Sequence, residues 1–125
     1  MPIARHLDAA TRVLRTTISG TVSLEDLREH FQLVRNMGAA SRPEIIDARH
    51  VIGLRFGARD LPKLAQCGRE VFTGAEMAPR AFVVEGMVYF GIARVFASLA
   101  SGWVQINVFD SMEPAESWLL QFLVH

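Results

Sequence analysis

The stretch AFVVEGMVYFGIARVFASLASGWVQINVF, from Ala81 to Phe109, alternates short apolar runs with one longer helical segment. Residues 81–84 and 104–109 are rich in β-branched and aromatic side chains and predict two strands. Residues 87–100 follow a break at Glu85-Gly86, and the spacing of their apolar residues predicts a helix. A strand, a helix and a strand in succession place the two strands parallel in one sheet.

The N-terminal part of the chain predicts further strands. Residues 3–8 and 12–19 are two β segments, and the short turn Ala9-Ala10-Thr11 between them requires an antiparallel hairpin. Gly20 breaks the pattern and is expected to end the second strand. Residues 44–48 form another short apolar run and predict a third strand.

Three more helices are predicted from their start signals. The first begins at the capping pair Ser23 and Asp26 and ends at Gly38, the second begins after Asp60, and the last begins at Asp110. Each has an apolar face, formed by Leu24, Leu27, Phe31 and Val34, by Leu61, Leu64, Ala65, Gly68 and Phe72, and by Ala115, Trp118, Leu119 and Phe122. The sequence therefore predicts one α/β domain over residues 1–125. Its mixed sheet has about five strands, an opening antiparallel hairpin and then mostly parallel strands, and four helices cover it.

Composition excludes several classes of protein. The 125 residues carry 13 basic and 13 acidic side chains, so the net charge is zero and a basic nucleic-acid surface is not expected. A single cysteine, Cys67, excludes an internal disulfide framework, and its helical position predicts a buried apolar role. Neither a signal peptide nor a membrane span is present in the sequence, so we expect a cytoplasmic protein.

Three segments carry a resemblance to a known family. They are FGIARVF at residues 90–96, VFDSMEPAESWL at residues 108–119 and IDAR at residues 46–49. In this order they resemble the SpoIIAA-like family of the STAS superfamily over nearly the whole chain. The resemblance implies that fold, a similarity to bacterial anti-sigma-factor antagonists, and a more distant one to lipid-carrying SEC14-type domains.

The resemblance also points to a difference in function. In the antagonists, a phosphorylatable serine stands at the start of the second helix. Here the matching positions are Arg55-Phe56-Gly57-Ala58, and no serine or threonine lies between Pro43 and Phe72. A phosphorylation site is therefore excluded at this position, whereas docking to a protein partner stays open.

Asp47, Arg49 and His50 follow the predicted third strand, where open α/β sheets bind ligands. An Asp-oriented His50 could act as a base and Arg49 could hold an anion. The alternative is a solvated loop in which Asp47 caps neighbouring amides. No hydrolase, nucleotide-binding or metal-binding motif accompanies these residues, so we predict no catalytic residue, metal or cofactor.

The third predicted helix has more apolar residues than one inward face requires. Its expected inward face is Val88, Ile92, Val95, Phe96 and Leu99, and Met87, Tyr89 and Phe90 add to it. Leu120, Leu123 and Val124 similarly lie outside the stripe of the last helix. This surplus either packs into a small core or is covered by a ligand or partner.

A ligand pocket is one arrangement that uses the surplus. Leu54 and Phe56 would face Met87, Tyr89 and Phe90 at the carboxyl edge of the sheet. The cations near its mouth would be Arg49, Arg55 or Arg94, which suits an amphiphile with an anionic head.

These observations favour a non-enzymatic module that binds an apolar or amphiphilic, lipid-like molecule, as a homodimer. The final helix carries no basic residue, so membrane contact is at most peripheral and a dimer contact suits that helix better. One alternative is a protein-interaction regulator that works without phosphorylation. A remote alternative is a small enzyme that uses Asp47 and His50.

Overall fold

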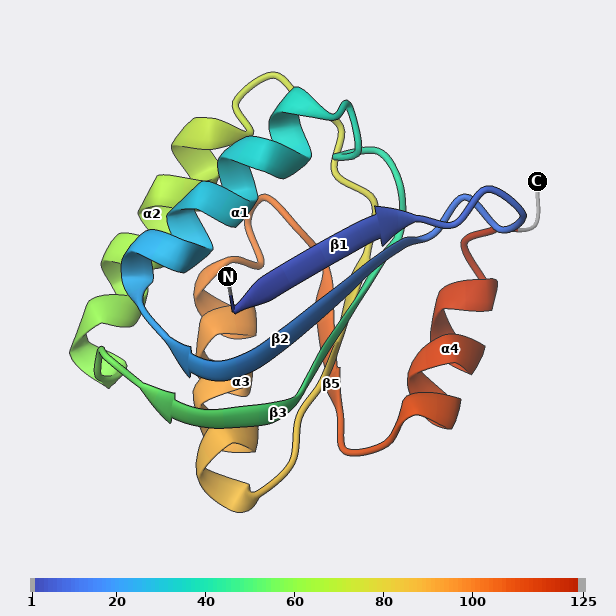
Figure 1. Cartoon of the computed structure of the whole chain (residues 1–125). Helices are drawn as coiled ribbons and strands as arrows, with labels where there is room; N and C mark the ends of the chain where they lie inside the picture. The colour runs from blue at the N-terminus through green and yellow to red at the C-terminus, as the bar shows by residue number, and fades with distance from the viewer. Residues whose placement is uncertain (1, 124–125) are drawn as a thin grey trace.

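The computed structural model describes residues 2–123 as a hairpin followed by alternating helices and strands (Figure 1). The strands are β1 (Ile3–Leu7), β2 (Leu14–Val22), β3 (Glu44–Leu54), β4 (Arg80–Val83) and β5 (Ile106–Phe109). The helices are α1 (Leu24–Asn36), α2 (Leu61–Val71), α3 (Met87–Leu99) and α4 (Met112–Leu120), with a short 3-10 turn η1 (Ala58–Asp60) before α2.

The five strands form one sheet in the order β1-β2-β3-β4-β5. β1 and β2 pair antiparallel, and β2, β3, β4 and β5 pair parallel with their neighbours. The predicted α/β fold, with its opening hairpin, mixed sheet and four helices, is confirmed.

Helices cover both faces of the sheet, with α1, α2 and α3 on one face and α4 on the other (Figure 1). Strand residues alternate between the faces, so neighbours in sequence enter different cores. The core on the α4 side contains Val13, Ile45, Ala81, Val83, Ala115 and Leu119. On the other face, Ile46 pairs with Phe82 and both pack under the three-helix layer.

The β2–β3 pair is longer than predicted and corrects two expectations. Gly20 does not end β2; it takes a φ of +74° at an irregularity, and the strand continues to Val22. β3 continues past its predicted end at Ala48 and reaches Leu54. Two register shifts interrupt the alternation of its residues without ending the strand, so the sequence pattern did not reveal its full length. β4 ends at Val83 opposite Asp47 and β1 begins opposite Ile18, so beyond both points β2 and β3 continue as a two-stranded ribbon that bends toward the helices (Figure 1).

The inward face of α3 also differs from the prediction. Ala93 and Phe96 are buried, but Val88, Val95 and Leu99 are exposed by 72%, 47% and 43%. When a helix is apolar on most sides, its sequence does not show clearly which side faces the core. Packing against the sheet then decides the orientation of α3. Within residues 2–123, no helix has the length and apolar character needed to cross a membrane.

The helix ends follow their local chemistry. The predicted capping box of α1 is confirmed, because the Asp26 amide donates to Ser23 Oγ (3.1 Å) and the Ser23 amide donates to Asp26 Oδ2 (2.9 Å). The N-cap of α4 is Ser111, one residue after the predicted Asp110.

Other predicted core positions divide between the interior and the surface. Leu120 is exposed, whereas Leu123 packs against the α4-side core. Val124 lies outside the described residues. Cys67 is only half-buried, contrary to the prediction.

Two helical glycines form a matched pair for testing the packing. A Cβ on Gly68 of α2 would overlap the ring of Trp103, whereas a Cβ on Gly91 of α3 would meet open space. We expect Gly68→Ala to lower the free energy of unfolding by about 1–3 kcal/mol through overpacking. Gly91→Ala should raise it by about 0.5–1 kcal/mol because alanine favours the helix. Urea unfolding of both variants measures this, and equal effects would contradict the packing described here.

Candidate functional site

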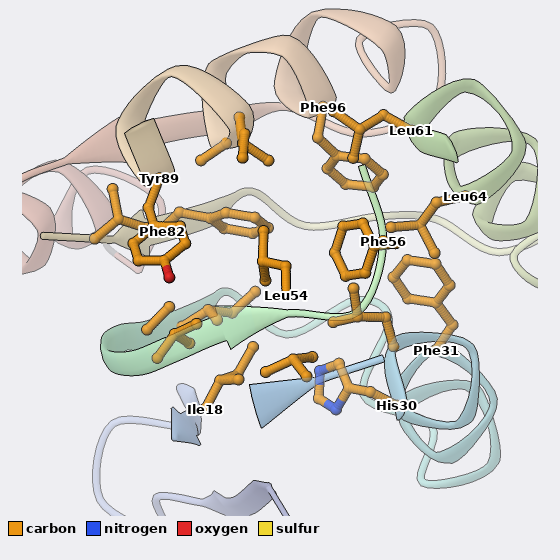
Figure 2. A pocket seen from close by; sticks show the side chains of 18 residues that line it. Ile18, His30, Phe31, Leu54, Phe56, Leu61, Leu64, Phe82, Tyr89 and Phe96 are labelled. Carbon is orange, nitrogen blue, oxygen red and sulfur yellow. The ribbon is translucent and has the colours of Figure 1, made fainter. Parts of the chain in front are cut away.

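A cavity of about 120 Å³ lies between the bent β2–β3 ribbon and the three-helix layer (Figure 2). Its sheet wall is formed by Ile18, Val22, Ile46, Ala48, Val51, Leu54, Phe82 and Val84. The remaining wall is formed by Leu27, His30, Phe31, Phe56, Leu61, Leu64, Tyr89, Ile92, Ala93 and Phe96. Among these described residues, only His30 and Tyr89 carry polar side-chain atoms.

The irregular part of β3 creates the cavity's sheet wall. Ala48, Val51 and Leu54 are three residues apart, yet all three line the cavity. In a regular strand, residues on one face are two apart, so the two register shifts of β3 are needed to bring all three inward. The same shifts leave Ile52 exposed by 78%.

The structure brings together three of the predicted site residues. Leu54, Phe56 and Tyr89 all line the cavity. Figure 2 shows Tyr89 at one end of it, with Phe31, Leu61 and Leu64 at the other. Leu54 ends β3 and Phe56 lies in the segment between β3 and α2, whereas Tyr89 belongs to α3. Two parts of the chain that are distant in sequence therefore meet at the cavity.

Asp47, Arg49 and His50 lie within β3 and are not among the cavity's lining residues. The Arg49 side chain donates from Nε to Asp47 Oδ1 (2.9 Å) and from Nη2 to Asp47 Oδ2 (2.8 Å). The Arg49 amide also donates to Asp47 Oδ1 (3.1 Å), which is the capping role considered from the sequence, in a strand rather than a loop. These Arg49 hydrogen bonds lower the pKa of Asp47. Asp47 thus holds Arg49, and His50 is exposed.

The other predicted residues lie apart from the cavity. Met87 is exposed by 91% at the start of α3. Phe90 and Arg94 line a separate, more polar groove between α3 and the edge strand β5. On that strand, Asn107 Oδ1 accepts the amide of Val108 (3.1 Å), so the side chain satisfies a backbone donor near the sheet's edge.

Sequence reasoning missed a buried polar network beside the cavity. Glu44 Oε2 accepts from Thr16 Oγ1 (2.6 Å) and lies 2.8 Å from His30 Nε2, while Glu44 Oε1 lies 3.2 Å from Arg80 Nε. Thr16, His30, Glu44 and Arg80 are each at most 4% exposed. The alternation of residues along β3 and β4 could have predicted this network. Glu44 lies on the same strand face as Ile46, and Arg80 lies on the same face as Phe82, so both charged side chains point into the core.

His30 belongs both to this network and to the cavity wall. Arg5 Nε donates to His30 Nδ1 (3.1 Å), and because arginine can only donate, Nδ1 is the accepting nitrogen. Nε2 then carries the proton and donates to Glu44. Both ring nitrogens are therefore used, although the ring borders the cavity.

Arg80 connects the network to two loops. Its Nη1 donates to the carbonyl oxygens of Ala40 (3.1 Å), Arg42 (2.7 Å) and Ala78 (2.9 Å), and Nη2 donates to that of Ala39 (3.2 Å). Burial of Glu44 opposes its ionisation, but the hydrogen bonds from His30 and Thr16 and the positive charge of Arg80 outweigh it and lower the pKa of Glu44. The network therefore contains a buried carboxylate with partners on both of its oxygens.

No group of three or more His, Cys, Asp or Glu side chains within residues 2–123 is arranged to hold a metal ion. The residues described around the cavity are likewise hydrocarbon and aromatic apart from His30 and Tyr89. The described walls of the cavity are thus almost entirely apolar.

Comparison with solved structures shows the fold. The chain is similar to a crystal structure of an uncharacterized protein from the DUF3478 family, with a SpoIIAA-like fold, from Shewanella loihica PV-4. The match has a TM-score of 0.58 and 19% sequence identity and covers 94% of this chain and 93% of that chain. The fold is therefore SpoIIAA-like, as the sequence resemblance implied. No protein-family model matches the chain, and no curated protein matches it.

The buried network gives a test of stability. Glu44→Gln leaves Arg80 buried without a carboxylate, and we expect a loss of about 3–5 kcal/mol in the free energy of unfolding at pH 7. Glu116→Gln is the control, because it breaks an exposed ion pair with Arg15 (3.1 Å) and should cost less than about 1 kcal/mol. Unfolding by urea measures both variants.

The pH dependence of the same variant supplies a second readout. The pKa of Glu44 is lowered by folding, so its stabilisation is present above its ordinary pKa of 4.5. It is lost as the pH falls from there through the folded value. The difference between wild type and Glu44→Gln should therefore shrink below about pH 4.5. A difference that stays constant from pH 7 to the acid limb would contradict this account.

Proposed function

We propose that this chain is a non-enzymatic binding module that holds an apolar small molecule, or the apolar part of an amphiphile, in the cavity. The cavity is the observation that carries the proposal. The cavity has a volume of about 120 Å³, is partly open to solvent and has almost entirely apolar walls. An occupant that covers these walls would remove their apolar surface from water.

The chemistry of the walls supports an apolar occupant. Each 100 Å² of apolar surface removed from water contributes about 2.5 kcal/mol, and the lining offers aromatic and branched aliphatic side chains on all sides. Val84 and Tyr89 follow the carboxyl end of β4, and this edge is where open α/β sheets bind ligands. Leu54, Phe56 and Tyr89 are only partly buried, which places them between the cavity and solvent.

A second candidate function has its own supporting observation. Met87, Val88, Val95 and Leu99 leave apolar side chains exposed along α3, and a protein partner or a second copy would cover them. This is the phosphorylation-independent interaction regulator of the sequence analysis. A cytoplasmic location, a homodimer and the absence of catalysis are part of our proposal as well.

Native mass spectrometry of the freshly purified protein, followed by denaturing extraction, tests the binding module. We expect a reproducible mass excess that is released as an apolar compound. Ala93→Leu, which projects into the cavity from α3, should abolish this excess. Ala97→Leu is the matched control, because Ala97 lines the other groove one turn further along the same helix, and this variant should keep the excess.

The outcomes separate the two functions. Retention by wild type and by Ala97→Leu, but not by Ala93→Leu, supports the cavity as the site. Retention by both variants contradicts it. A clean homodimer without any mass excess would instead favour the interaction regulator.

A further inference from the structure

We infer that the cavity selects an uncharged, apolar ligand of about one aromatic ring, or an equally compact hydrocarbon. This inference rests on the proposed function and specifies its ligand. It departs from the sequence hypothesis of a lipid-like molecule with an anionic head. Charge and size each lead to it.

Charge excludes an anion from the cavity. None of its described lining residues is an arginine or a lysine, and His30 already uses Nδ1 for Arg5 and Nε2 for Glu44. An ionised carboxylate placed there would lose its water without gaining a cation or a free donor from that ring. Such a transfer is strongly unfavourable, so the ligand should be neutral.

The arginines considered for an anionic head are engaged or lie elsewhere. Arg49 donates two side-chain hydrogen bonds to Asp47. Arg94 lines the groove against β5. Arg55 stands between the lining residues Leu54 and Phe56 but is itself exposed. Arg49 is thus paired with Asp47, Arg94 lies at the other groove, and Arg55 is not among the residues that line the cavity.

Volume limits the ligand to a compact group. A cavity of about 150 Å³ lined by Leu, Ile and Phe binds benzene, and this one has about 120 Å³. Pockets for drug-sized ligands have about 300–1,000 Å³, so the space between these walls holds about one ring and not a whole long acyl chain. Phe31, Phe56, Phe82 and Phe96 are all on the walls, and their edges and faces suit a flat aromatic ring.

Tyr89 contributes its ring rather than a polar contact. It carries the only hydroxyl among the described lining residues and lies at one end of the cavity (Figure 2). The surface that the lining residues present to the cavity is almost entirely apolar, so this hydroxyl is not part of the cavity's wall. The class that fits is therefore a small apolar molecule without a charged group.

The test compares three probes of one ring size on the full chain. Toluene is apolar, p-cresol adds one neutral hydroxyl, and benzoate adds a negative charge. Their dissociation constants are measured by titration of amide chemical shifts in two-dimensional NMR. We expect toluene to bind at least as tightly as p-cresol, because the cavity's wall offers the hydroxyl no partner, and benzoate to bind at least about 100-fold more weakly than toluene.

Variants assign the contacts. Tyr89→Phe should leave toluene binding unchanged, because the ring and not the hydroxyl lines the cavity. Ala93→Leu should abolish toluene binding, and Ala97→Leu should not change it. Equal affinity for benzoate and toluene, or toluene binding lost in Tyr89→Phe, would overturn the inference.

Palmitate distinguishes failure of this inference from failure of the proposed function. If wild type retains palmitate and Ala93→Leu does not, while the ring probes do not bind, the proposed binding module stands and the selection for compact neutral ligands is wrong. If neither palmitate nor any ring probe binds and no compound is extracted from the purified protein, both are wrong.

Discussion

The buried carboxylate of Glu44 organises one end of the molecule. It lies on β3 between Arg80 of β4 and Thr16 of β2, and His30 reaches it from α1. Arg5 of β1 contacts His30, so residues of four strands and one helix meet around the carboxylate of Glu44. A buried ion pair contributes little net stability by itself, but it strongly disfavours arrangements that leave one partner alone. The network therefore acts mainly on specificity, since it fixes how α1 lies over the sheet and where the two loops held by Arg80 run.

The sheet departs from regular geometry next to this network, beyond the end of β4. There the β2–β3 ribbon continues with two register shifts. The sheet bends, the helices above it do not close the gap, and an apolar cavity is left between them, with His30 on its wall. One core thus contains a polar, well-satisfied network and an apolar, incompletely filled cavity side by side, and the proposed binding role is located at the cavity.

Much of the fold could be predicted from the sequence because its signals are local. The hairpin, the capping box at Ser23 and the strand–helix alternation each depend on a few adjacent residues. Of the residues expected from the sequence to line a pocket, Leu54, Phe56 and Tyr89 line the cavity, whereas Met87, Phe90 and Arg94 lie elsewhere. β3 was predicted too short because its register shifts disrupt the period-two pattern. The orientation of α3 and the meeting of His30 with Glu44 depend on tertiary packing, which no local pattern encodes.

The double role of His30 divides the cavity wall into two kinds of surface. On the His30 side, a substitution that reshapes the cavity also removes a partner of Glu44, so it changes folding and binding together. On the α3 side, Ile92 and Ala93 contact the cavity through hydrocarbon alone, and their replacement by other apolar residues changes its shape without leaving a charge unpaired. The shape of the cavity can therefore be changed along α3 without disturbing the network around Glu44, and a designer who wishes to reshape it would begin on α3.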